Sequence, residues 1–157
     1  NYRLPKASYD IDLVPIETFD RKPEFLIVGG LVFQPLTEPL MRSMGRLAPI
    51  RLACFRNDLP TPERPSVVFL SQVLPDPINV DYHELRSLPL ERVNGRPIRV
   101  LKDIVEAITK PAGQVHVFEF TQGLGMNRVV IDAATLSAAD ARILKRYGIP
   151  ASSQLAH

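Results

Sequence analysis

The most apolar stretch of this 157-residue chain, Phe25–Leu36 (FLIVGGLVFQPL), is interrupted at its centre by two adjacent glycines. Glycine adopts backbone angles that other residues avoid, and it lets a second backbone approach closely. The glycine pair therefore predicts a bulge, a turn or a place where another chain docks. We expect an extended segment from about Leu26 to Phe33 around it.

The size and charge of the chain limit what it can be. With 157 residues, of which 45% are hydrophobic, it matches one domain with a proper core. Its 19 basic and 17 acidic residues are spread out, without the dense basic block that nucleic-acid binding requires. No apolar run approaches the roughly 20 residues of a membrane span. We expect a fragment of a larger protein, with a single domain at 9–152 and tails at 1–8 and 153–157.

Alternating polarity and β-forming residues predict strands in several parts of the chain. The predicted strands are residues 9–16, 67–74, 114–121 and 127–133, of which the last two form a hairpin. Asn94–Gly95 predicts another tight hairpin, because both residues accept the positive φ angles of a primed turn. Asp76–Asp81 is interpreted as turn and cap chemistry.

Capping residues and a helical repeat predict the helices. Thr37 begins a helix that stops at Gly45, with Glu38 near its positive end. Apolar residues at i, i+3, i+4 and i+7 predict a helix from Leu101. A further short helix is predicted to start at Pro49. The last predicted helix starts with a capping box formed by Ser137 and Asp140 and ends at Gly148. Together with the strands, they predict an α+β domain.

Candidate catalytic chemistry is sparse. Cys54 with His83 or His116 is the one economical pairing of a nucleophile with a base, and no local signature accompanies it. A small Cys-dependent hydrolase is therefore the remote alternative. The three histidines are not in a metal-ligand spacing, so we expect no metal site, no cofactor and no catalytic residue.

Four motifs, taken in order, resemble the C-terminal (second) PDZ-like domain of the HtrA/Deg trypsin-like serine proteases. They are FLIVGGLVFQPLTEPL, VVFLSQVLPDPINVDY, LERVNGRPIRVLKDIVEAI and ILKRYGIPAS. The likeness extends from about Asp12 to Ser152. It implies a partly open antiparallel β-barrel or sandwich of about five to six strands with two to four helices, enlarged by a helical and loop insertion at 37–65.

The same resemblance implies where a polypeptide would bind. A PDZ ligand adds as a strand between a β-strand and a helix, with its terminal carboxylate on a glycine-containing turn. By resemblance, the candidate peptide-binding residues are Val28, Gly29, Gly30, Leu31, Val32, Phe33, Leu101, Val105 and Ile108. The insertion supplies a candidate interface, formed by Leu40, Met41, Met44 and Leu47. Where the family has Gly-Leu-x-x-Gly-Asp, this chain has Leu85–Glu91, so ordinary capture of C-termini is not favoured.

Two functions follow from the resemblance, and both remain open. The first is a non-catalytic regulatory module that acts in protein–protein interaction and oligomer assembly of a protease involved in protein quality control. The second is a peptide-binding domain that delivers substrate C-termini to that protease. The partner is a polypeptide in either case: the protease domain, a neighbouring subunit of a homo-oligomer, or a substrate. Nucleic acid and membrane insertion are not expected, and the resemblance implies the bacterial periplasm or cell envelope.

Overall fold

The computed structural model describes residues 13–15, 22–45, 50–121 and 127–155. Its strands are β1 Phe25–Val28, β2 Leu31–Pro35, β3 Val68–Val73, β4 Leu88–Val93, β5 Arg96–Pro97, β6 Val115–Phe120, β7 Arg128–Asp132 and β8 Ser153–Gln154. Its helices are α1 Glu38–Met44, α2 Ile50–Ala53, α3 Leu101–Ile108 and α4 Leu136–Tyr147, with 3₁₀ turns η2 Cys54–Asn57 and η3 Pro77–Tyr82. Within these ranges, no helix has the length and apolar character needed to cross a bilayer.

The strands form one antiparallel sheet in the order β7–β6–β4–β3–β2–β1–β8, with β5 paired to β4. The α+β class is confirmed, and the sheet is not closed into a barrel. In the part of the chain that the structure describes, the strands number eight, and two of them, β5 and β8, are only two residues long. Strand β5 belongs to the hairpin expected at Asn94–Gly95, whereas β8 lies in a segment expected to be a tail. The resemblance implies about five to six strands, so the observed sheet has more.

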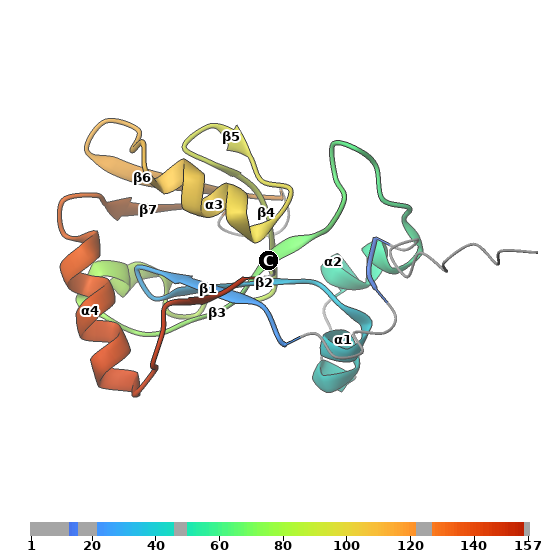
Figure 1. The fold of residues 1–157 in the computed structure, drawn as a ribbon, viewed down its shortest axis with the longest axis horizontal. Helices are drawn as coiled ribbons and strands as arrows, with labels where there is room; N and C mark the ends of the chain where they lie inside the picture. Colours follow the sequence, from blue (N-terminus) through green and yellow to red (C-terminus); the bar gives the residue numbers. More distant parts are fainter. Residues whose placement is uncertain (1–12, 16–21, 46–49, 122–126, 156–157) are drawn as a thin grey trace, which may run out of the picture.

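Strand β4 links the two halves of the sheet. Leu88 and Pro89 pair with β3, and residues 90–93 pair with β6. Figure 1 shows β4, β6 and β7 above β1, β2 and β3, with α4 at one end of the molecule and the helices of the 37–65 insertion at the other. Between the halves, the rings of Phe33 and Phe118 stack with their centroids 5.5 Å apart. The main core therefore lies between the two halves.

The glycine pair in the first apolar run forms a turn. β1 and β2 are a hairpin in which Val28 lies opposite Leu31, and the two residues between them are Gly29, with φ of 56°, and Gly30, with φ of 81°. Positive φ at both central positions is the geometry of a type I′ turn. The single extended segment expected over Leu26–Phe33 is thus corrected: the chain reverses direction at its centre.

Strand β3 serves two cores at once. Val68 and Leu70 belong to the main cluster, whereas Phe69 between them is buried in a second cluster formed with the insertion. In this second cluster Met41, Leu52 and other side chains of the insertion pack on the sheet. Burial on both faces explains why residues 67–70, at the start of this strand, are continuously apolar.

Most predicted elements are confirmed, and the start of α4 is corrected. Thr37 caps α1 by accepting a hydrogen bond from the Leu40 N–H, and Gly45 ends the helix. For α4, Gly148 is the left-handed C-cap as expected, but the N-cap is Thr135 and no side chain caps it. The capping box expected at Ser137 is therefore absent from α4, because the helix begins earlier.

The expected terminal segments also need correction where the structure describes them. Residues 153–154, predicted to be part of a tail, form β8 on the edge of β1. Of the strand expected at 9–16, residues 9–12 and 16 lie outside the described residues, and Leu13 and Val14 are buried in the second cluster without forming a strand. Pro49, the expected start of the second helix, also lies outside the described residues.

Candidate polypeptide-binding site

Strand β2, the strand expected to lie beside a bound peptide, has a neighbour on each side. Leu31, Val32 and Phe33 pair with Val28, Ile27 and Leu26 of β1 and also with Val73, Gln72 and Leu70 of β3. An added strand needs an unpaired row of N–H and C=O groups. Over Leu31–Phe33 both edges of β2 are therefore occupied, because the type I′ turn folds β1 onto one edge and β3 pairs with the other.

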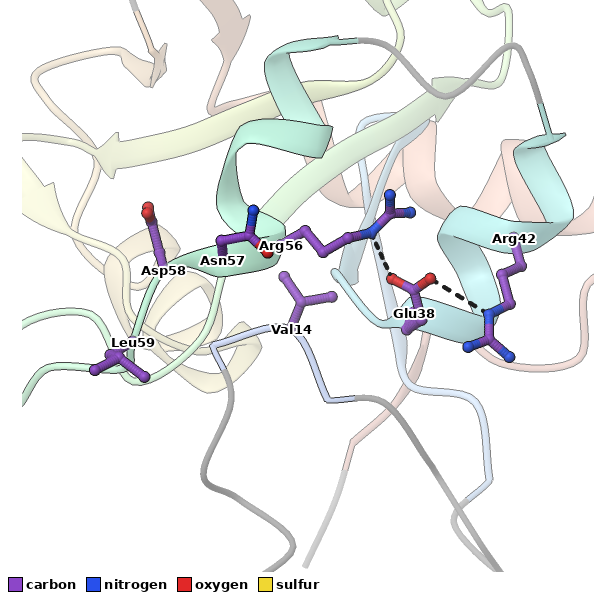
Figure 2. A pocket seen from close by; sticks show the side chains of 7 residues that line it. All are labelled: Val14, Glu38, Arg42, Arg56, Asn57, Asp58 and Leu59. Carbon is purple, nitrogen blue, oxygen red and sulfur yellow. Dashed lines mark hydrogen bonds and ion pairs between the residues drawn. The ribbon is translucent and has the colours of Figure 1, made fainter.

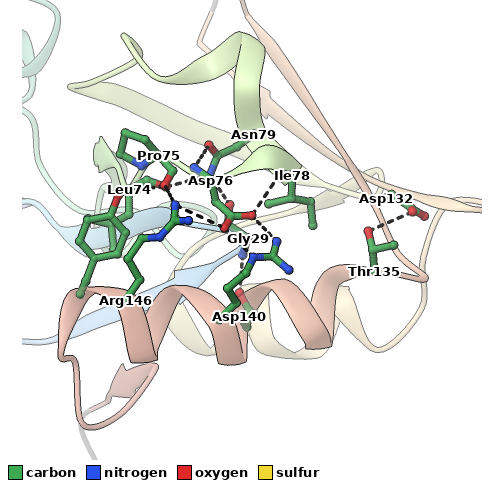
Figure 3. A network of polar contacts seen from close by, with 12 residues as sticks. Gly29, Leu74, Pro75, Asp76, Ile78, Asn79, Asp132, Thr135, Asp140 and Arg146 are labelled. Carbon is green, nitrogen blue, oxygen red and sulfur yellow. Dashed lines mark hydrogen bonds and ion pairs between the residues drawn. The ribbon is translucent and has the colours of Figure 1, made fainter.

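The turn itself is held by hydrogen bonds to the chain's own groups, and Figure 3 shows those made by Gly29. The Gly29 N–H donates to Oδ1 of Asp140 on α4 at 2.6 Å. The Gly29 carbonyl accepts from Nδ2 of Asn79 at 2.7 Å, and the Gly30 carbonyl accepts from the Leu74 N–H at 2.8 Å. A side-chain carboxylate of the domain thus occupies the Gly29 donor to which the resemblance assigns a peptide's terminal carboxylate.

Asp140 is buried enough for its titration to change. Burial raises the pKa of this carboxyl from 3.8 to about 6, and the hydrogen bond from the Gly29 N–H opposes part of that rise. The sequence places Asp140 in a capping box, which is a local role. The structure gives it a contact 111 positions away, which no local pattern signals.

We expect Asp140→Asn to be more stable than the wild type at pH 8 and to lose this advantage toward pH 4. The raised pKa means that the folded state binds the proton more tightly, so the stabilisation from Asp140 is complete below pH 3.8 and is lost as the pH rises through about 6. Asparagine keeps an oxygen acceptor for Gly29 without burying a charge. Because the side chain is partly exposed, we expect the free energy of unfolding of Asp140→Asn to exceed that of the wild type by about 1 kcal/mol at pH 8.

Urea unfolding at several pH values measures this difference. Burial lowers the pKa of His116, which acts with the opposite sign and weakens the fold as the pH falls below 6.5. His116 is present in both proteins, so the difference between them isolates Asp140. If the difference in free energy of unfolding between the two proteins does not change with pH, the raised pKa of Asp140 is contradicted.

A second carboxylate fixes α4 against η3. The Asp76 side chain is fully buried and binds Arg142 through both of its oxygens, with Nε of Arg142 2.9 Å from Oδ2. Arg146 lies 4.0 Å from the same carboxylate. The hydrogen bonds from Arg142 hold the pKa of Asp76 below its usual value. Asp76 also caps η3 together with Asn79, which confirms the cap chemistry predicted at 76–81.

The side chains of the candidate peptide-binding residues lie mostly in the core. Val28, Leu31 and Phe33 are buried in the main cluster, and so is Leu101 on α3. Ile108 packs against that cluster, whereas Val105 is 36% exposed. Helix α3 is thus packed on the sheet as the helical stripe predicts, and Val105 is the residue of the candidate helix wall that faces solvent.

The candidate interface in the insertion is only partly at the surface. Met41 is buried in the second cluster, and Leu40 and Met44 pack against it; Leu47 lies outside the described residues. Met41 is therefore corrected from a surface position to a core position, because α1 turns it toward β3. Among the insertion residues that the structure describes, the large apolar side chains at the surface are instead Ile50 and Leu59, at 88% and 69% exposure.

A hollow of about 440 Å³ lies on the insertion (Figure 2). The Glu38 carboxylate stands in it, 2.9 Å from Nε of Arg56 and 3.3 Å from Nε of Arg42. The hollow is lined by Val14, Glu38, Arg42, Arg56, Asn57, Asp58 and Leu59. Two cations and two anions line it, so it has no net charge that would favour one kind of ligand.

The residues considered for catalysis have separate partners. The Cys54 thiol is exposed and donates to the Arg51 carbonyl at 3.2 Å. Nε2 of His83 lies 3.4 Å from the Asp76 carbonyl oxygen, and Nδ1 of the buried His116 lies 3.0 Å from Nδ2 of Asn94. Among residues 13–15, 22–45, 50–121 and 127–155, no group of three His, Cys, Asp or Glu side chains is placed to hold a metal ion.

Comparison with known proteins agrees with this fold. Residues 14–154 match the family model described as a PDZ domain. The chain is 31% identical over 149 residues to "Protease Do-like 2, chloroplastic" of Arabidopsis thaliana, a match that covers 89% of this chain and 23% of the relative. It is 27% identical over 144 residues to "Putative protease Do-like 3, mitochondrial" of the same plant, covering 89% and 24%. The chain spans about a quarter of the length of these relatives. The chain therefore belongs to the PDZ domain family and is similar to the PDZ region of Do-like (HtrA/Deg) proteases.

Proposed function

We propose that this chain is a non-catalytic interaction module of a Do-like protease and that it holds subunits together rather than capturing the C-termini of peptides. The relatives are named proteases, and the chain spans only their PDZ region. By analogy, the trypsin-like catalytic domain lies in another part of the parent protein. The partner of this module is then a polypeptide of the same assembly.

One observation carries the choice between assembly and peptide delivery. The strand and the turn that would receive a peptide are already engaged, since β2 is paired to β1 and β3 and the Gly29 N–H is bound by Asp140. A peptide would have to displace either β1 or the Asp140 contact. Displacing β1 would expose Leu26 and Val28 from the main core, which costs several kcal/mol of apolar burial.

Peptide titration tests this proposal. We expect fluorescein-labelled peptides that end in a hydrophobic residue with a free carboxylate to show no saturation up to about 1 mM. The matched control is the same peptides with amidated C-termini, which should give the same baseline. Saturable binding by the carboxylate peptides alone would support delivery and overturn the assembly proposal.

Sedimentation of the full-length parent protein gives the second readout. With residues 14–154 removed, we expect the parent protein to sediment as a smaller oligomer, because its subunits lose this module. An unchanged oligomer would contradict the proposal.

A further inference from the structure

The outer edge of β1 carries an added strand that comes from the C-terminal side of α4. Phe25 lies opposite Gln154 and Leu26 lies opposite Ser153. The Ile27 N–H donates to the Ser152 carbonyl at 2.7 Å. Residues 152–155 are thus held on β1 in the way that a sheet edge holds an extended peptide.

Two side-chain contacts complete this attachment. Gln154 Nε2 donates to the Pro23 carbonyl at 2.7 Å. Leu155 packs against the main cluster as a partly buried residue. The segment 152–155, with the sequence SSQL, is therefore bound by main-chain pairing and a single apolar anchor.

The segment can leave β1 without disturbing α4. The helix ends on its own C-cap, where the Ile149 N–H donates to the Leu144 carbonyl at 2.9 Å and Gly148 is left-handed. Helix α4 is fixed to the rest of the domain by Asp140 and Arg142, which lie before the cap. The segment itself is only half-buried, and the linker residues Pro150 and Ala151 are exposed.

We propose that the outer edge of β1 is a strand-docking edge and that its exchange partner is the 152–155 segment of a second copy of this chain. Each copy would place its segment on β1 of the other, with the register that the single chain shows. The proposal rests on the assembly function proposed above and names its surface and its partner. Such an exchange keeps every contact of the segment, so it costs little beyond the loss of freedom on association.

The length of the linker limits the geometry of the exchanged pair. Ile149–Ala151 contributes three residues, which span at most about 11 Å when extended. The two β1 edges must therefore face each other closely across a twofold axis, with the C-terminal end of each α4 beside the partner's β1. The register supplies the selectivity, because the small Ser153 lies opposite the buried Leu26 while Leu155 supplies the anchor.

Cross-linking between two differently labelled chains tests the exchange. In the full 157-residue chain with Cys54→Ser, one preparation carries Phe25→Cys and the other carries Gln154→Cys. These positions lie directly opposite each other, so a short bismaleimide joins the two chains only when the segment of one lies on β1 of the other. After mixing, we expect a covalent heterodimer whose yield increases with protein concentration.

Two controls make the result decisive. Phe25→Cys mixed with Ser137→Cys, an exposed position on α4, measures random collisions. A single chain carrying both Phe25→Cys and Gln154→Cys must cross-link internally, which shows that the substituted proteins fold with the observed register. If the segment is exchanged, the two cysteines are held side by side and their effective concentration is raised. We therefore expect the heterodimer yield to exceed that of the Ser137 control by roughly fivefold or more.

The outcomes separate this inference from the proposed function. A yield no higher than that of the Ser137 control, with internal cross-linking intact, overturns the exchange. If the full-length protein still loses subunits when 14–154 is removed, the assembly function stands and the contact lies on another surface. An unchanged full-length oligomer would instead contradict the proposed function itself.

Discussion

Replacement of Gly30 by alanine is expected to lower the free energy of unfolding by about 3–5 kcal/mol. A Cβ at this position would lie 2.5 Å from the Leu74 carbonyl oxygen and against Nδ2 of Asn79. Both groups are fixed, because Asn79 is fully buried and Leu74 donates its N–H to the Gly30 carbonyl. The backbone at Gly30, with φ of 81°, adds strain for any residue with a side chain.

Gly95→Ala is the matched control for this prediction. Gly95 has nearly the same backbone angle, with φ of 77°, but a Cβ there would have no atom within 4 Å. Its substitution measures the conformational term alone, about 1 kcal/mol. Urea unfolding of both variants gives the steric term as the difference. Equal losses at the two sites would contradict the close packing around the β1–β2 turn.

Asn79→Ala is expected to lower the free energy of unfolding by about 3 kcal/mol. Asn79 is completely buried, and its amide makes three hydrogen bonds to the main chain. Nδ2 donates to the carbonyls of Gly29 and Leu74, and Oδ1 accepts from the Asp76 N–H at 3.0 Å. Alanine would leave the Gly29 and Leu74 carbonyls and the Asp76 N–H without the hydrogen bonds from Asn79. Leaving a buried polar group unpaired costs more free energy than a formed hydrogen bond contributes to stability.

Two further variants test whether the stability lost in Asn79→Ala comes from the missing hydrogen bonds or from the smaller side-chain volume. Asn79→Asp has nearly the same size but would place a carboxylate oxygen against two carbonyl oxygens, so we expect it to be at least as destabilising as Asn79→Ala. Asn57→Ala, at an exposed position, should change the stability by less than about 0.5 kcal/mol. A stable Asn79→Asp protein would show that shape alone matters at this site.

The two sites should also be coupled, because the Cβ that Gly30→Ala introduces would contact the Asn79 side chain. In a protein with both Gly30→Ala and Asn79→Ala, part of the clash is relieved, so we expect the combined loss to be smaller than the sum of the two single losses. Strict additivity would argue against this contact.

Several elements could be predicted because their causes lie within a few residues of one another. Apart from the exposed Val105, the apolar stripe from Leu101 to Ile108 packs against the core, and Asn94–Gly95 forms the turn between β4 and β5. Thr37 caps α1, and Gly148 ends α4 in the left-handed conformation. Each of these depends on propensities and hydrogen bonds that operate locally.

The candidate site shows where local patterns stop being informative. A strand such as β2 has the same sequence pattern whether its edge is open or paired, so the pairing with β1 cannot be derived from Leu31–Phe33. Met41 has the spacing of a helix face, but whether that face meets solvent or Phe69 depends on how the insertion folds back.

By itself, the sequence determined the α+β class and the position of most helices and strands, but not that the glycine pair reverses the chain. Only the tertiary structure decided that β1 covers β2, that Asp140 binds the turn and that residues 153–154 complete the sheet edge. The physical reason is distance along the chain. Asp140 meets Gly29 across 111 positions, and such contacts are selected by the packing of whole elements rather than by the residues beside them.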